Sequence, residues 1–284
     1  FMRRPTVASI ARGEADDGTD VRLVSTSENK ALHWLSTPPP STKVETKWLS
    51  DAYVCVHDFT GALWAFRDFI RLSQRPCLGL RCTPEVISGV SAVRELALKY
   101  ANELLEILPT NCAVRLVGYS AGCQIAYRIA LTLEAAGRSV QLALLDGRLP
   151  ALQDGSEALA SKEQTANAHK WAWALLQRGA EGVDADDLSA TNRTDVERDL
   201  LVLGSMLGSD GCSLALKVLN LEDEAPMTER VIGPTVYVKT GESSIEDQDR
   251  KIEDTRQIDG THLSFMFDHA ADVLRIVEEL THMN

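Results

Sequence analysis

A serine stands between two glycines in the segment "LVGYSAG", residues 116–122. The run before it is apolar enough for a buried strand, and the run after it has the spacing of a helix. A G-x-S-x-G between a strand and a helix is typical of a sharp turn that lifts the serine hydroxyl above a sheet, at a helix N-terminus. This setting predicts that Ser120 is a nucleophile. The alternative is that it only caps the helix.

A serine hydroxyl attacks a carbonyl carbon efficiently only when a base takes its proton. On folds with this turn, the acid and then the base follow the serine along the chain. His262, in "IDGTHLSFMF", lies in a loop between the last predicted strand and the last predicted helix. The other histidines precede the serine or fall in predicted helices: His33, His57, His169, His269 and His282. We therefore predict His262 as the base, the alternative being an ordinary surface loop residue.

Two carboxylates compete for the role of the acid that orients this base. Asp146 ends the apolar segment "LALLD" and is followed by a glycine that opens a turn. Glu242 ends the next predicted strand, "PTVYVKTGE", where many hydrolases of this architecture keep the acid. We favour Asp146, and Glu242 remains the second candidate. Each could instead be a solvated loop carboxylate.

A negative oxygen that forms during attack on a carbonyl needs two backbone N–H donors. Ala121 supplies one because it follows the serine. The second is expected from the loop "VHDFTGAL", most simply from Phe59 or Thr60, with Gly61 allowing a close approach.

These residues require elements that hold them together. Strand-like and helix-like segments alternate with short connections, which is typical of a parallel sheet covered on both faces. Strands are expected at residues 52–58, 77–82, 113–120, 139–146, 234–242 and within 251–260, and helices at 63–74, 91–108, 121–136 and 268–283. Gly137 stands where a left-handed cap would end the third helix.

The alternation stops between Pro150 and Pro234. Residues 151–232 contain helical segments but no strand pattern, and an insertion of this size is too long for a simple loop. We predict a helical lid there. Residues 1–45 are expected to form a partly disordered linker with a short strand at 21–26, and residues 46–284 to form one domain.

The chain has 284 residues and a formal net charge of −12. This charge argues against a nucleic acid or an anionic membrane as partner. No apolar run approaches the roughly 20 residues that a bilayer crossing needs, and no signal peptide is visible. The six cysteines lie mostly in apolar segments without metal-binding spacing, so reduced thiols, no metal site and a cytoplasmic location are expected.

The segments "VHDFTGALWAF", "CLGLRCTPEV", "RLVGYSAG", "LLDG" and "GTHLSFM" resemble the type I thioesterase domain that ends animal fatty acid synthases. They are also similar to the domains that close polyketide synthases and nonribosomal peptide synthetases. The resemblance runs from about residue 50 to the end, in order and in approximate spacing. The fatty acid synthase pattern has a proline where this chain has Asp58, and a bulky aromatic residue where it has Ala121.

The resemblance implies an α/β-hydrolase fold with Ser120, Asp146 and His262 as catalytic residues and a lid that binds an acyl chain. Thr60 and the lid residues Trp171, Trp173, Met206 and Leu207 are candidates for substrate contact, although the lid residues could simply pack the lid helices.

The implied reaction is hydrolytic or cyclising release of a fatty acyl, polyketide or peptidyl chain through an acyl-serine intermediate. The chain would be carried on the phosphopantetheine of an upstream carrier domain, in the same polypeptide, and no cofactor of the domain's own is implied. A free-standing carboxylesterase or lipase is the alternative, but the H-G-G-G oxyanion loop of such enzymes is missing. A non-enzymatic binding protein usually lacks a member of the triad.

Overall fold

A computed structural model of the chain describes residues 31–36, 42–149, 174–182, 195–221, 229–241, 252, 254–262 and 264–282. Within these residues the chain forms two compact units. One unit, within residues 21–153 and 221–284, contains a seven-stranded sheet with strand order β1-β3-β2-β4-β5-β6-β7. The strands are β1 (Leu32–Trp34), β2 (Tyr53–Val56), β3 (Cys77–Leu80), β4 (Val114–Tyr119), β5 (Val140–Leu145), β6 (Thr235–Thr240) and β7 (Asp254–Ile258).

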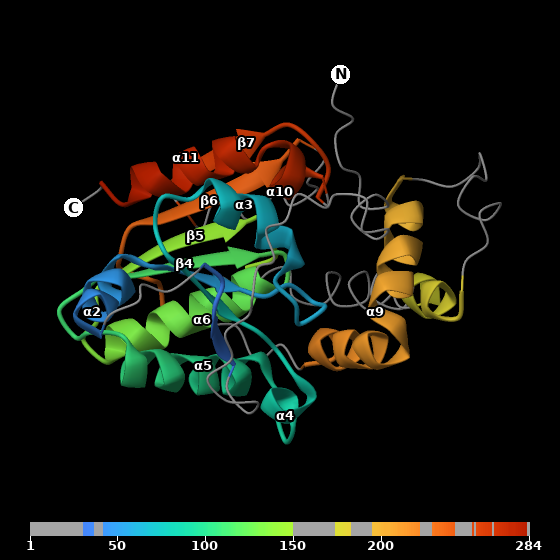
Figure 1. Ribbon diagram of the computed structural model, residues 1–284, viewed down its shortest axis with the longest axis horizontal. Coiled ribbons are helices and arrows are strands. Elements are labelled where there is room, and N and C mark those ends of the chain that lie inside the picture. Colours follow the sequence, from blue (N-terminus) through green and yellow to red (C-terminus); the bar gives the residue numbers. More distant parts are fainter. Residues whose placement is uncertain are drawn as a thin grey trace. The chain divides into compact units, whose positions relative to one another are not determined.

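Neighbouring strands from β3 to β7 are parallel, and β1 pairs antiparallel with β3 at the edge. The helices of this unit are α2 (Thr42–Asp51), η1 (Trp64–Phe66), α3 (Arg67–Leu72), α4 (Pro84–Ile87), α5 (Val93–Ile107), α6 (Gly122–Ala135), α10 (Phe265–Asp268) and α11 (Ala270–Leu280). In Figure 1, α5 and α6 lie on one side of the sheet and α3, α10 and α11 on the other. The predicted parallel sheet covered on both faces is therefore confirmed.

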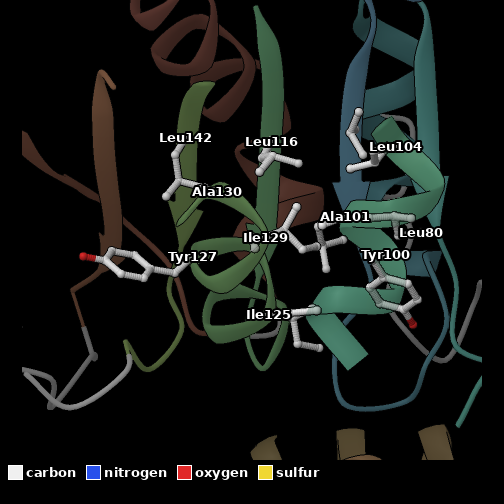
Figure 2. Close-up of a cluster of buried hydrophobic side chains, with 14 of the residues drawn as sticks. Leu80, Tyr100, Ala101, Leu104, Leu116, Ile125, Tyr127, Ile129, Ala130 and Leu142 are labelled. Carbon is white, nitrogen blue, oxygen red and sulfur yellow. The ribbon is translucent and has the colours of Figure 1, made fainter. Parts of the chain in front are cut away.

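The core between the sheet and helices α5 and α6 is built from side chains at helical spacing on both helices. Figure 2 shows Tyr100, Ala101 and Leu104 of α5 near Ile125 and Ile129 of α6, with strand residues behind them. All of these side chains are at most 2% exposed. The apolar stripe that identified these helices in the sequence is therefore the stripe that they bury.

The opposite face of the sheet has a second core. Alternating strand residues, such as Val117 and Tyr119 of β4, point to this face because successive side chains of a strand alternate. They pack with Phe69 of α3, Phe265 of α10 and Val273 of α11. Two buried faces explain why the central strands read as nearly continuous apolar runs.

Strand β1 lies inside the segment that the sequence predicted as a linker. Its three residues pair with β3, and Ala31 N and Leu32 N both donate hydrogen bonds to the Glu103 carboxylate of α5. A strand of three residues gives too short a pattern to be recognised. The sheet thus begins before residue 46, while the strand expected at 21–26 lies outside the described residues.

The described part of the other unit consists of residues 174–182, helical at 174–180, and residues 195–220, which include α9 (Asp195–Leu219). Leu176 and Leu201 are fully buried, and the Cys212 thiol lies 3.6 Å from the Leu176 carbonyl oxygen. Gly208 has non-helical backbone angles and divides α9 into two helices.

The stretch Leu200–Leu219 of α9 is long and apolar enough to cross a membrane when length and composition alone are considered. The kink at Gly208 interrupts it, however, and a buried helix of a globular protein passes the same test. The stretch is therefore weak support for a membrane span.

Candidate active site

Ser120 stands at the sharp turn between β4 and α6, as predicted. Its φ angle is +55°, a value that residues other than glycine rarely adopt. The backbone around it is held by hydrogen bonds from Ser120 N to Leu145 O (3.0 Å) and from Cys123 N to Ser120 O (3.0 Å). The strained turn is therefore fixed by the end of β5 and by the first turn of α6, where N–H groups lack helical partners.

The glycines around Ser120 are required by close packing. A Cβ atom at Gly118 would lie 2.6 Å from the carbonyl oxygen of Gly122, and one at Gly122 would lie 2.4 Å from that of His57. The atoms in the way are backbone atoms, which cannot turn aside as a flexible side chain can. The motif thus lets α6 start directly against β4 and the loop that follows β2.

We expect Gly122→Ala to lower the free energy of unfolding by about 3 kcal/mol, the upper end for overpacking, because α6 must move away from His57. Gly137→Ala is the matched control. Gly137 has a φ of +77° but open space around its Cβ position, so only conformational strain of about 1 kcal/mol is expected. Urea denaturation of both variants measures the difference. Equal losses would contradict the close-packing argument.

His262 lies in the loop between β7 and α10 and contacts both other predicted members of the triad. Its Nε2 is 2.9 Å from Ser120 Oγ, and its Nδ1 is 2.8 Å from Asp146 Oδ2. A neutral imidazole with its proton on Nδ1 donates to the carboxylate and accepts from the serine hydroxyl. The structure thus brings together three residues that lie up to 142 positions apart.

Asp146 follows β5 and is only 3% exposed. Besides the contact with His262, its Oδ1 accepts a hydrogen bond from Thr240 N (3.0 Å), and its Oδ2 accepts one from Thr240 Oγ1 (3.1 Å). Burial alone would raise the pKa of this carboxyl. The hydrogen bond and the charge of His262, together with the two hydrogen bonds from Thr240, outweigh burial and lower the pKa. Asp146 is therefore held as a carboxylate. Glu242 lies outside the described residues.

Thr240 was not among the residues that the sequence singled out. It ends β6, the strand beside β5, and donates to the acid from both its backbone and its side chain. The segment "YVKTGE" showed only that a polar residue ends a strand two positions before Glu242. The segment does not show that its strand lies beside the strand of Asp146, because that depends on the strand order of the sheet.

The loop His57–Ala62 after β2 lies against the start of α6, as the close approach of His57 O to Gly122 shows. Thr60 donates from both N (2.7 Å) and Oγ1 (2.5 Å) to Asp58 Oδ1. Because the Thr60 N–H is engaged there, Phe59 remains the candidate for the second oxyanion donor. The prediction that Thr60 contacts substrate does not fit either, since its side chain is 2% exposed and bonded within the loop.

Asp58 is a buried carboxylate in this loop, at 2% exposure. Burial raises its pKa to about 6, although hydrogen bonds from Thr60 and the charge of His262 act in the opposite direction. The Trp64 indole also lowers this pKa, but neither Asp58 Oδ2 nor Trp64 Nε1 reaches hydrogen-bond geometry with a described residue. The loop therefore holds an incompletely satisfied acid close enough to His262 to interact electrostatically.

A raised carboxyl pKa makes the folded state bind a proton more tightly than the unfolded state. Stability that is fully present below about pH 4 should therefore be lost as the pH rises through about 6, by up to about 3 kcal/mol. We expect Asp58→Asn to remove this loss, so that the variant matches the parent near pH 4 and is more stable at neutral pH. Urea denaturation across this range measures it. Parallel curves for both proteins would contradict it.

Of the predicted lid residues, Trp171 and Trp173 lie outside the described residues. Met206 and Leu207 lie on α9 directly before the kink at Gly208, and Met206 is 41% exposed. Contact of these residues with an acyl chain stays a prediction.

Comparison with known proteins finds a family match and several similar solved structures. The model of the family described as "Thioesterase domain" matches residues 53–281. This range contains Ser120, Asp146 and His262. None of the curated proteins matches the chain.

Several solved structures are similar. The thioesterase domain SrfTE, described as cyclising the lipopeptide antibiotic surfactin, is 16% identical with a TM-score of 0.52, and the match covers 82% of this chain and 92% of that chain. YbtT, a type II thioesterase of the yersiniabactin pathway, is 16% identical with a TM-score of 0.52 over 89% and 98% of the two chains. The epoxide hydrolase CorEH is 12% identical with a TM-score of 0.56 over 88% and 94%. Identities this low show the fold alone, which is the predicted α/β-hydrolase fold.

Proposed function

Because the chain belongs to the thioesterase domain family, whose members are hydrolases that act on thioesters, we propose that it releases an acyl chain from the phosphopantetheine arm of a carrier protein through an acyl-Ser120 intermediate. The observation that carries the proposal is the hydrogen-bonded series from Ser120 Oγ through His262 to Asp146. An alcohol, an imidazole and a carboxylate in this order are the groups that acyl transfer requires.

In the first half of the reaction, Ser120 Oγ attacks the thioester carbonyl carbon while His262 Nε2 takes the hydroxyl proton. The carbonyl oxygen becomes negative and accepts hydrogen bonds from the backbone N–H groups of Ala121 and Phe59. When the C–S bond breaks, the imidazolium returns its proton to the sulfur, and the pantetheine thiol leaves. The acyl group is then esterified to Ser120.

In the second half, water, or a hydroxyl or amine of the acyl chain itself, loses a proton to His262 and attacks the ester. Water yields a free acid, and an internal nucleophile yields a ring. Ser120 recovers its proton from the imidazolium. Asp146 supports both halves because its lowered pKa keeps it negative beside the imidazolium.

We place the carrier domain upstream in the same polypeptide. The net charge of −12 would oppose a free encounter with a carrier domain, since carrier domains are usually acidic too. A tethered carrier is present at a millimolar-scale effective concentration and needs little electrostatic attraction. If so, loading from a separate acidic carrier should speed up when salt is added, because salt screens the repulsion.

Intact-protein mass spectrometry with a panel of acyl-pantetheine thioesters tests the proposal. We expect the parent protein to gain the mass of the acyl group transiently, and Ser120→Ala to gain none. Ser88→Ala, which alters an exposed serine after α4, is the matched control and should acylate normally. The thioester that loads fastest identifies the class of acyl chain.

A protein that cleaves simple carboxylic esters but no thioester would contradict the proposal and favour the esterase alternative. An acyl mass on Ser120→Ala would show that another group is acylated. Absence of any adduct or turnover with every substrate would contradict an acyl-serine mechanism.

A further inference from the structure

Tyr119 precedes Ser120 in the chain and contacts the proposed base in two ways. Its hydroxyl donates a hydrogen bond to the backbone carbonyl oxygen of His262 (2.7 Å). Its ring also stacks on the imidazole, with 5.2 Å between ring centroids and 21° between ring planes. The last residue of β4 thus holds both the backbone and the ring of His262.

The alternation of side chains along β4 explains this contact. Tyr119 points to the sheet face that is covered by α3, α10 and α11, and it is 1% exposed. The loop that carries His262 enters α10 on this same face (Figure 1). The ring of Tyr119 also lies 5.8 Å from that of Phe265, the first residue of α10. Tyr119 therefore supports the loop at His262 and again three residues later.

Apart from the two contacts of the His262 ring with Asp146 and Ser120, the remaining hydrogen bonds of the described loop residues are local. Thr261 N donates to Ser264 Oγ, Ser264 N donates to Thr261 Oγ1, and Phe265 N donates to Thr261 O. These bonds give the loop its shape but do not tie it to the sheet. The bond from Tyr119 spans 143 positions and joins the loop to β4, the strand that directly precedes Ser120.

A base on a half-buried loop needs such an anchor. The His262 side chain is 42% exposed, and the contacts of its two ring nitrogens among the described residues are those with Asp146 and Ser120, the latter of which it must deprotonate during the reaction. Resting on the proposed function, we propose that Tyr119 is a positioning residue that sets the distance between His262 Nε2 and Ser120 Oγ. The hydroxyl fixes the backbone, and the ring fixes the tilt of the imidazole.

Two substitutions separate these contributions. Tyr119→Phe removes the hydroxyl and keeps the ring, and we expect kcat for a thioester to fall about tenfold with an unchanged KM. Tyr119→Leu removes both, and we expect a fall of about 10²-fold, the scale of a misplacement of 1 Å. KM should stay constant because Tyr119 acts through the base and not on the substrate.

The matched control is Tyr127→Phe. Tyr127, on α6, is 6% exposed and its hydroxyl bonds to the backbone N–H of Val231 (3.4 Å), away from the triad. The Tyr127→Phe substitution should lower the melting temperature without lowering kcat. If Tyr127→Phe loses as much kcat as Tyr119→Phe, the effect is general destabilisation and the proposal is wrong.

A second readout does not depend on turnover. The proton shared between His262 Nδ1 and Asp146 gives a downfield NMR resonance, assigned by its absence in His262→Ala. We expect Tyr119→Phe to shift and broaden it, because a looser imidazole exchanges this proton with water more readily, and Tyr127→Phe to leave it unchanged.

An unchanged resonance together with parental kcat in both Tyr119 variants overturns the proposal. A raised KM with parental kcat also overturns it, since Tyr119 would then contact the substrate. If the parent protein turns over no thioester, the proposed function fails, and the resonance alone still decides whether Tyr119 positions His262.

Discussion

Replacing Ser120 by alanine is expected to lower kcat for thioester cleavage by about 10⁶-fold, the scale observed when a triad serine is removed. The loss is this large because the covalent route through Ser120 is no longer available. His262 would keep Asp146 as a partner but would have no hydroxyl to deprotonate. Steady-state kinetics with the best-loading pantetheine thioester measures it, and a thermal melt confirms that the variant is folded.

The triad is also expected to act as a unit. In the double variant Ser120→Ala with His262→Ala, kcat should fall little further than in Ser120→Ala alone, because each substitution removes the same step. Losses that simply multiply would show that the two residues act independently. A loss below about tenfold in Ser120→Ala would exclude Ser120 as the nucleophile.

Asp146→Asn should lower kcat by about 10⁴-fold while leaving the fold intact. The amide keeps the shape of the carboxylate, and its oxygen in the place of Oδ1 can still accept the hydrogen bond from Thr240 N. Its NH₂ group, however, donates toward His262 Nδ1, and this favours the tautomer with its proton on Nε2. An imidazole protonated on Nε2 cannot accept the proton of Ser120.

Glu242→Gln is the matched control for this substitution, because Glu242 was the other candidate for the acid in the sequence. It should leave kcat within about twofold of the parent, as expected of a substitution outside the triad. The reverse result, with Asp146→Asn near the parental rate and Glu242→Gln strongly impaired, would make Glu242 the functional acid. Kinetics of the two variants side by side therefore decides between them.

Most of the sheet could be predicted because its signals are local. The apolar run of β4, the glycines beside Ser120 and the apolar stripe of α6 are each visible in a few consecutive residues. Gly137, predicted as a left-handed cap, has a φ of +77°. The predicted ends of these strands and helices agree with the observed ends within a few residues for the same reason. Strand β1 was missed because three residues carry too little pattern, and its pairing with β3 depends on a distant partner.

The contacts that tune the site could not be predicted in this way. Thr240 binds the acid only because β6 lies next to β5, and Tyr119 reaches His262 only because the loop after β7 enters on the same face of the sheet. The sequence pattern also did not reveal that Thr60 is buried and donates two hydrogen bonds to Asp58. Each of these contacts is a property of neighbours in space.

The amino-acid sequence by itself determined the residue types and their order: a serine in a strand-to-helix turn, then an aspartate after a strand, then a histidine in a late loop. Local geometry and side-chain chemistry are enough for that. Only the tertiary structure showed that Asp146 reaches His262, that Thr240 holds the acid and Tyr119 contacts the base, and that the Thr60 N–H is bonded to Asp58. These depend on strand order and side-chain direction, which place residues up to 143 positions apart within hydrogen-bond distance.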